Sequence, residues 1–441
     1  MEMPTRDKIL TTALTLYVFS QILFLLFVQF PKGYHCEEFH YVPSAKQFLT
    51  LVENQNWEHP PLGKEIMAIG IGIGGDRPFG WRLMSTVFGA LTLVGMYFWG
   101  LAVFRNQRNA LYVALLTVFN QLLYIQARAG MLDTFMMAFL TWGLAAFCAA
   151  WDRERTPNEM KRLHAFAGLM FGLATATKWT SMVAWFSCIL LILGVLLLQK
   201  WGVRFSTQNS PPSEDWYSPK LWKGLGLKHW GLCFLIIPLL AYFATFIPFL
   251  FIHRTPAYGL WDLLMMQPRM LDGQLRVVSD HPYMSRWLSW PWMARPIWYS
   301  FEKEGPSQEW AHGVLMLGNP LIMWAGVLAV IACMAHWLET RSRETFLIVA
   351  TYCFFFFCWA VIPRKVSFYY YYYPAGMTLS LALTFVFDWL EKTAQSEPAR
   401  WGRWLFLAIS GGLFIYFFPI ISGIRIPADS FRNWMWFGSW I

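Results

Sequence analysis

Runs of about 20 mostly apolar residues recur along the whole chain. Such a run crosses the hydrocarbon core of a membrane as a helix, because a helix satisfies its own backbone hydrogen bonds. Hydrophobic residues make up 56% of the 441 residues and charged residues 14%, against about a quarter in soluble domains. We therefore expect an all-α integral membrane bundle of about eleven spans, at residues 9–30, 79–104, 109–126, 131–151, 163–178, 180–199, 231–252, 314–337, 345–362, 366–388 and 403–422.

Basic residues set the expected orientation of these spans. Cytoplasmic connectors of membrane proteins are enriched in Lys and Arg, and the short connectors 105–109 and 151–164 are basic, as is the N-terminal segment. This pattern places the N-terminus in the cytoplasm and the segment 31–78 outside. An odd number of spans then places the C-terminal tail, residues 423–441, outside as well.

Two long outward loops hold most of the polar residues. Loop one covers residues 31–78, and the loop between spans seven and eight covers residues 253–313. Within them, segments 44–55 and 259–267 have the amphipathic spacing of short helices that lie along a membrane surface. We expect a single transmembrane domain over residues 1–441, with loop one as its catalytic loop.

Charge and cysteine content argue against other classes of protein. The net charge is +9, but the basic residues are scattered over loops on both faces, which favours orientation and attraction to membrane lipids over nucleic-acid binding. All of the seven cysteines except Cys36 fall within predicted spans. We therefore expect no framework of extracytoplasmic disulfides.

The sequence HCEEFHY, residues 35–41, follows the first span and carries two adjacent carboxylates, Glu37 and Glu38. Adjacent side chains at a helix exit point in different directions, so we expect one to face a cavity and the other to brace the loop. A carboxylate that is partly shielded from water is a better general base for a hydroxyl. The alternative is that both are solvated loop acids.

The sequence HPPLGK, residues 59–64, comes later in the same loop. Its two prolines stiffen the chain, and its glycine permits a close turn. We expect His59 and Lys64 to be held on this stiff segment near the membrane. Taken alone, the pattern indicates a rigid loop.

Arg82 and Asp133 are charges inside predicted spans. A cation is costly there unless it meets an anion, so we expect Arg82 to pair with a glutamate or a phosphate. The same argument applies to the anion Asp133, which we expect to meet a cation. The alternative for both residues is that the side chain snorkels to the interface.

The segment 362–376, IPRKVSFYYYYYPAG, joins predicted spans nine and ten. Arg364 and Lys365 place positive charge at the outer membrane boundary, where it suits an anionic lipid headgroup. Tyr370 and Tyr371 belong to a run of tyrosines that surrounds the next helix. Some of these must face the protein interior, although an aromatic belt at the interface also explains the run.

Together these motifs resemble the protein O-mannosyltransferases and their bacterial relatives, membrane-embedded glycosyltransferases of the GT-C type that use polyprenyl-phosphate sugars. The resemblance covers nearly the whole chain and rests mainly on CEEFHY, WEHPPLGKE and RAGMLD. Further similar landmarks are ATATKWTSM (174–182), SWPWMARPIWY (289–299), LGNPLIMW (317–324) and the RKVSFYYYYYP turn.

Two departures from the family pattern matter. The family's acidic pair is usually Asp-Glu, so Glu37 adds a methylene at the position of the proposed catalytic Asp. The chain also has no room for the large lumenal domain that eukaryotic members carry between spans seven and eight. This favours a bacterial or archaeal enzyme of the cell inner membrane, with its active site on the extracytoplasmic face.

The resemblance implies inverting transfer of a hexose, expected to be mannose, from a polyprenyl-phosphate sugar to Ser or Thr hydroxyls of proteins. Glu37 is then the general base, and Glu38 orients the loop or the sugar. Cations neutralise the phosphate as the glycosidic bond breaks, and the expected ones are Arg82, Arg364 and Lys365. The residues expected to position substrates are His40, His59, Lys64, Asp133, Tyr370 and Tyr371.

Several alternatives stay open. The acceptor could be a lipid or glycan, and the sugar an aminosugar. A transporter would line a pathway with intramembrane charges, but we see no internal repeat, and the candidate residues gather at one face. A divalent metal is also an alternative, although the spacing of its candidate ligands is not a standard zinc pattern: His35, Glu37, Glu38, His40 and His59. We expect no required cofactor.

Overall fold

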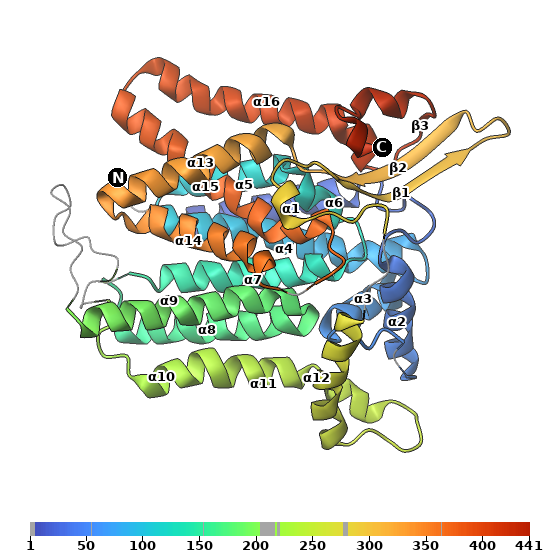
Figure 1. The fold of residues 1–441 in the computed structure, drawn as a ribbon, viewed down its shortest axis with the longest axis horizontal. Helices are drawn as coiled ribbons and strands as arrows, with labels where there is room; N and C mark the ends of the chain where they lie inside the picture. The colour runs from blue at the N-terminus through green and yellow to red at the C-terminus, as the bar shows by residue number, and fades with distance from the viewer. Residues whose placement is uncertain are drawn as a thin grey trace.

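The computed structural model describes residues 5–53, 55–152, 154–202, 217, 221–276, 281–362 and 364–441. Long helices run side by side along one axis, which is horizontal in Figure 1. These helices are α1 (Arg6–Leu25), α4 (Pro78–Phe104), α5 (Gln107–Phe119), α6 (Gln121–Gln126), α7 (Leu132–Ala149), α8 (Pro157–Thr177), α9 (Met182–Lys200), α13 (Pro320–Thr340), α14 (Arg343–Phe357), α15 (Tyr373–Ala394) and α16 (Glu397–Ile421).

Each predicted span coincides with helical structure. In the part of the chain that the structure describes, eight helical segments are both long and apolar enough to cross a membrane. The predicted spans 109–126, 163–178 and 366–388 correspond to α5 with α6, to α8 and to α15, which are not among those eight. The protein is therefore a mostly helical, multi-pass membrane protein, and the count of eleven stays a prediction.

The predicted span 231–252 is a broken helix. It consists of α10 (Leu227–Gly231), a π-helical turn η2 (Leu232–Ile236), α11 (Ile237–Ala244) and a 3₁₀ turn η3 (Ile247–Phe251). It packs closely against α8, where a Cβ on Gly168 would lie 1.9 Å from the Cys233 carbonyl oxygen. A Cβ on Gly172 would lie 2.4 Å from the Pro238 carbonyl oxygen. The two glycines, four residues apart, therefore let the helix backbones approach.

Three shorter helices lie at one end of the bundle, at the right in Figure 1: α2 (Glu38–Thr50), α3 (Leu62–Gly74) and α12 (Leu260–Leu275). The predicted surface helix at 44–55 thus begins earlier, at Glu38, and ends at Thr50, where the C-cap residue Leu51 has a positive φ of 53°. The predicted helix at 259–267 is present and longer. The segment 59–64, predicted as a rigid loop, leads directly into α3, whose N-cap residue is Pro61.

The structure has a small antiparallel sheet at the same end, which the all-α prediction did not include. Its strands are β1 (Ile297–Glu304), β2 (Trp310–Met316) and β3 (Ile426–Pro427), in the order β1-β2-β3. The predicted span 314–337 therefore starts too early, because β2 continues to Met316 and α13 begins at Pro320. Through β3, the C-terminal tail joins the segment between α12 and α13 (Figure 1).

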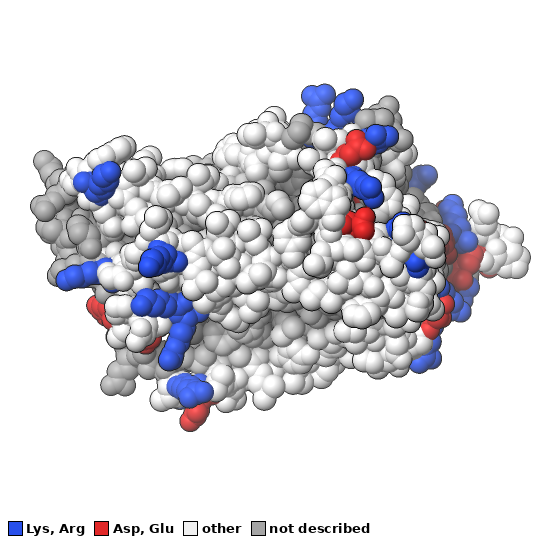
Figure 2. Space-filling model, turned by 90° about the horizontal axis from the view of Figure 1, so that it is seen from below, with Lys and Arg blue, Asp and Glu red and all other residues white. Residues whose placement is uncertain are grey.

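Short 3₁₀ turns complete the described elements: η1 (Trp179–Ser181), η4 (Trp287–Ser289), η5 (Cys358–Ala360), η6 (Tyr369–Tyr372), η7 (Ser430–Trp434) and η8 (Gly438–Trp440). Figure 2 shows one face of the molecule, with charged side chains gathered toward its two ends and an uncharged band between them. This distribution suits a protein that crosses a membrane along the bundle axis.

Candidate active site

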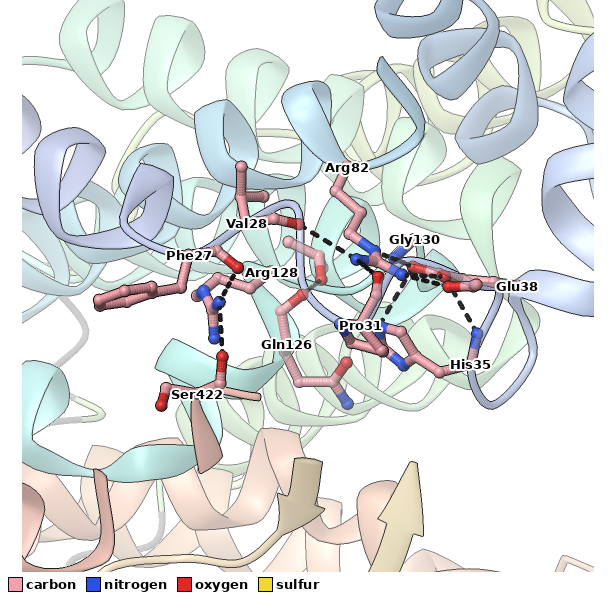
Figure 3. Close-up of polar contacts among 12 residues, drawn as sticks. Phe27, Val28, Pro31, His35, Glu38, Arg82, Gln126, Arg128, Gly130 and Ser422 are labelled. Carbon is pink, nitrogen blue, oxygen red and sulfur yellow. Dashed lines mark hydrogen bonds and ion pairs between the residues drawn. The ribbon is translucent and has the colours of Figure 1, made fainter. Parts of the chain in front are cut away.

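Glu38 forms a buried ion pair at the start of α2. Its Oε1 lies 2.8 Å from Arg82 Nε, and its Oε2 lies 2.8 Å from Arg82 Nη2. The backbone N–H groups of Gly130 and His35 also donate to this carboxylate, at 2.7 and 3.2 Å (Figure 3). Both charged side chains are fully buried. Bidentate geometry and the additional donors are what a buried ion pair needs to offset desolvation.

The other donors of Arg82 bind backbone carbonyls at the exit of α1. Nη1 donates to the carbonyls of Val28 and Pro31, at 3.1 and 2.8 Å, and Nη2 donates to that of Gly33, at 2.9 Å (Figure 3). A guanidinium has five N–H donors, so all of those in Arg82 are used within the protein. The sequence predicted either a glutamate or a phosphate as the partner of Arg82, and the structure shows the glutamate, Glu38. The predicted contact between Arg82 and the donor phosphate is wrong, because no N–H donor of Arg82 is left for it.

These contacts keep Glu38 ionised at neutral pH. Burial alone would raise the pKa of Glu38, but Arg82, His35 and the hydrogen bonds outweigh it and lower that pKa to about 2. Burial lowers the pKa of His35 to about 3, so His35 is neutral beside the pair. A buried carboxylate with such a low pKa is a poor proton acceptor. Glu38 therefore braces the loop.

Glu37 is half-buried and faces the tyrosines of η6. The Tyr370 hydroxyl donates to Glu37 Oε1 at 3.2 Å. Just before Glu37, Cys36 has a positive φ of 50°, and its N–H donates to the Tyr299 carbonyl at 3.0 Å. This turn fixes the backbone of loop one against β1. The two adjacent glutamates consequently have different surroundings, as the sequence predicted.

Lys178 lies next to these tyrosines. Its Nζ is 5.1 Å from the ring centroid of Tyr370 and 5.2 Å from that of Tyr371. It is also 2.7 and 2.9 Å from the two carboxylate oxygens of Asp133, and both partners are about 3% exposed. Asp133 is thus paired inside the protein. The sequence analysis missed Lys178 as a site residue, although a lysine between two apolar runs is itself a functional signal.

A cavity of about 200 Å³ opens beside Lys178. Its lining includes His59, Gln274 and Arg364. Arg364 Nη1 donates to Gln274 Oε1 at 3.0 Å, and the Arg364 guanidinium lies 5.0 Å from the ring centroid of Tyr371. Thr180 lines both this cavity and a smaller hollow bounded by Asp133 and Tyr371. Two cations from distant parts of the chain therefore meet at one cavity.

The remaining predicted site residues divide into buried and exposed ones. Lys64 is fully buried, and its Nζ donates to the carbonyls of His59, at 2.9 Å, and Asn56, while burial lowers the pKa of Lys64 to about 7. Burial, followed by the nearby charges of Lys178 and Lys64, lowers the pKa of His59 well below its ordinary value. Lys64 thus supports the turn that carries a neutral His59, whereas His40 and Lys365 are exposed.

Arg128 belongs to the RAGMLD motif but was not predicted as a site residue, and it joins the ends of α1 and α16. Its Nη2 donates to the carbonyls of Phe27 and Ser422, at 2.6 and 2.9 Å (Figure 3). The ends of α1 and α16 are thereby fixed against the segment before α7. Among the residues that the structure describes, no group of three or more His, Cys, Asp or Glu side chains is placed to share a metal ion.

Two models of known protein families match parts of this chain. A model described as the C-terminal four-transmembrane region of protein-O-mannosyltransferase matches residues 260–440. A second model, described as dolichyl-phosphate-mannose-protein mannosyltransferase, matches residues 58–211. The two ranges together cover more than half of the chain. The chain belongs to the protein O-mannosyltransferase family.

Individual proteins similar to this chain are named as mannosyltransferases. A polyprenol-phosphate-mannose–protein mannosyltransferase of Mycolicibacterium smegmatis is 23% identical, over 92% of this chain and 87% of the relative. One of the same name from Corynebacterium glutamicum is 23% identical, over 92% and 88%. The yeast Pmt1-Pmt2 complex bound to the sugar donor aligns with a TM-score of 0.79 at 14% identity, over 100% of this chain and 93% of that one.

A second solved structure extends the fold comparison. ArnT of Cupriavidus metallidurans aligns with a TM-score of 0.62 at 13% identity, over 96% of this chain and 68% of that one. Both structural neighbours show the GT-C type of membrane fold predicted from the sequence. This protein O-mannosyltransferase is therefore a membrane glycosyltransferase in which the half-buried Glu37 contacts Tyr370, and the Tyr370 ring lies 5.1 Å from Lys178, one of two cations that line a cavity.

Proposed function

We propose that this enzyme transfers mannose from a polyprenyl-phosphate carrier to Ser or Thr hydroxyls of proteins. The names of the bacterial relatives support a polyprenol-phosphate-mannose donor and a protein acceptor. The observation that carries the proposal is the contact between Glu37 and Tyr370, next to a cavity that holds Lys178 and Arg364. A base and phosphate-binding cations at one cavity are the groups that this transfer needs.

Glu37 is the general base in this proposal. It takes the proton from the acceptor hydroxyl while the hydroxyl oxygen attacks the anomeric carbon of the sugar. The bond from that carbon to the phosphate oxygen breaks, and polyprenyl phosphate leaves with the electron pair. Configuration at the anomeric carbon is inverted. Tyr370 holds the Glu37 carboxylate in place through the hydroxyl that donates to it.

Lys178 and Arg364 bind the donor phosphate. The charge on the phosphate grows as the glycosidic bond breaks, so their attraction is stronger in the transition state than in the bound substrate. Lys365 is exposed beside Arg364 and adds positive charge at the rim. Asp133 orients Lys178, while His59 and Gln274 complete the cavity wall. Tyr371 positions both cations through its ring.

The active site faces the extracytoplasmic side of the cell inner membrane, with the N-terminus in the cytoplasm. The short basic connectors support this orientation. The C-terminal tail lies at the active-site end, because β3 pairs with β2 there. No cofactor is required in this mechanism, since the two cations act on the leaving phosphate.

Sugar transfer by the purified enzyme tests this function. We expect labelled mannose to move from polyprenyl-phosphate mannose to Ser/Thr-containing acceptor peptides, and Glu37→Gln to lower the rate by about 10²–10⁴-fold, as expected for loss of a general base. Glu53→Gln is the control, because Glu53 is an exposed acid of the same loop that pairs with Arg254. Glu37 is not the base if its variant transfers as fast as the wild type.

The acceptor class is tested in the same assay. Membrane extract supplies lipid and glycan acceptors together with proteins, and the label is then followed into each fraction. Label in protein hydroxyls supports the proposal. Label confined to lipid or glycan would replace the protein acceptor with the alternative, and no transfer from any polyprenyl-phosphate sugar would contradict the proposal as a whole.

A further inference from the structure

A second cavity lies at the opposite end of the bundle from the proposed active site. Its volume is about 350 Å³, larger than the active-site cavity of about 200 Å³. It opens among α1, α4, α7 and α8. Arg105 at this cavity and Arg82 near the active site belong to the two ends of α4, about 35 Å apart at a rise of about 1.5 Å per residue.

The inner wall of this cavity is apolar. Phe98 and Leu101 come from α4, Trp142 from α7, and Leu163 and Phe166 from α8. Alanines of α7 leave the space between these large side chains. A wall of this kind favours a hydrocarbon chain over a polar solute.

The rim of the cavity is charged and holds Arg105, Asp152, Arg155 and Arg343. Arg105 Nη2 lies 3.0 Å from Asp152 Oδ1. Arg155 donates through Nε to the Ala149 carbonyl at 2.7 Å, and among the described residues its Nη groups have no hydrogen-bond partner. Three cations and one anion leave the rim with net positive charge.

Arg343 holds the cavity walls together. It donates to the carbonyls of Ala102 and Val103 at the end of α4, at 2.8 and 3.0 Å. It also donates to those of Cys148 and Trp151 at the end of α7, at 2.9 and 2.7 Å. The cation thus meets the negative ends of two helix dipoles and fixes them to α14. Because Arg343 is committed to these carbonyls, Arg105 and Arg155 are the cations available to a ligand.

We propose that this cavity binds an anionic glycerophospholipid of the cytoplasmic leaflet. An acyl chain lies on the apolar wall, and the headgroup phosphate lies beside Arg105 and Arg155. The proposal follows from charge complementarity, since a molecule that matches both parts must have a hydrocarbon chain joined to an anion. It does not depend on the proposed mannosyl transfer, because the two cavities lie at opposite ends of α4.

Native mass spectrometry of the purified protein, titrated separately with phosphatidylglycerol, phosphatidylcholine and polyprenyl phosphate, tests the proposal. We expect the wild type to retain one phosphatidylglycerol in preference to phosphatidylcholine. The double variant Arg105→Gln/Arg155→Gln should retain it about tenfold less well, which corresponds to about 1.4 kcal/mol. Arg162→Gln should behave as the wild type, because Arg162 is an exposed arginine of α8 that does not line the cavity.

A second variant keeps the test valid if the double variant folds poorly. Ala145→Phe fills the cavity from α7 without changing any charge, and it should also reduce phosphatidylglycerol retention. Equal retention of the two phospholipids by the wild type would overturn the proposal. So would phosphatidylglycerol retention that neither variant changes, or variants that lose polyprenyl phosphate while they keep phosphatidylglycerol.

Discussion

Glu37 and Glu38 are neighbours in the sequence with different partners in the structure. The sequence predicted that one would face a cavity and the other would brace the loop. The residues alone did not decide which, because the partner of Glu38 is Arg82, 44 residues further along; the family resemblance assigned the base to Glu37 and the loop to Glu38. Lys178 was missed for a similar reason. Its partners Asp133 and Tyr370 belong to other helices, so its place in the site follows from packing between distant segments.

The buried Glu38–Arg82 pair predicts a pH dependence of stability. The pKa of Glu38 is about 2 in the folded protein against an ordinary value of 4.5, so the ionised pair stabilises the fold fully above about pH 4.5. That contribution, about 3 kcal/mol at about 1.36 kcal/mol per pKa unit, is lost as the pH falls from 4.5 toward 2. In Glu38→Gln, the thermal unfolding temperature should be lower than in the wild type at pH 6.

The difference between the two proteins should shrink as the pH falls below 4.5. Burial lowers the pKa of His35 in both proteins and Glu38 partly offsets this, so the difference is read above about pH 3, where His35 is neutral in both. A difference that stays constant from pH 6 to pH 3 would contradict an ionised Glu38. Unfolding is followed by the fluorescence of tryptophan in detergent solution.

At the scale of helices and strands, hydropathy predicted the positions of the spans because each apolar run forms its helix locally. The sheet was not predicted, since β2 pairs with β3 more than a hundred residues later, and no local pattern records that pairing. The predicted span 231–252 is confirmed as one candidate span, Leu227–Phe251, but its π-helical and 3₁₀ turns were not predicted. Its shape depends on the glycines of α8 that allow close contact.

The close contact between α8 and η2 predicts a strong effect of a single methyl group. In Gly168→Ala, the new Cβ would lie 1.9 Å from the Cys233 carbonyl oxygen, so the helices must separate. Overpacking of this kind typically costs about 1–3 kcal/mol, and the thermal unfolding temperature should fall. Gly194→Ala in α9 is the matched control, because no heavy atom lies within 4 Å of its added Cβ. Equal unfolding temperatures for the two variants would contradict the close contact between Gly168 of α8 and η2.

At the scale of the whole molecule, loop one (residues 31–78), the α8–α9 turn and the segment before α15 meet at one end of the bundle. The sequence predicted that loop one and the segment before α15 would meet, but not that the α8–α9 turn would join them. It placed Arg82 at the phosphate, whereas the structure commits Arg82 to Glu38 and puts Lys178 beside Arg364 instead. Arg128 adds to this assembly by joining the ends of α1 and α16.

The central claim is that Lys178 and Arg364 bind the donor phosphate while Glu37 acts on the acceptor. Equilibrium binding of labelled polyprenyl phosphate, which lacks the sugar, separates these roles. We expect Lys178→Gln and Arg364→Gln each to weaken binding by about 10–100-fold, as for loss of a charge-assisted hydrogen bond.

The matched control is Arg276→Gln on α12, whose side chain is 78% exposed, and it should bind as the wild type does. Glu37→Gln should also bind polyprenyl phosphate normally while failing to transfer mannose. Wild-type affinity in both Lys178→Gln and Arg364→Gln would contradict the account, because the cavity between them would then not be the phosphate site.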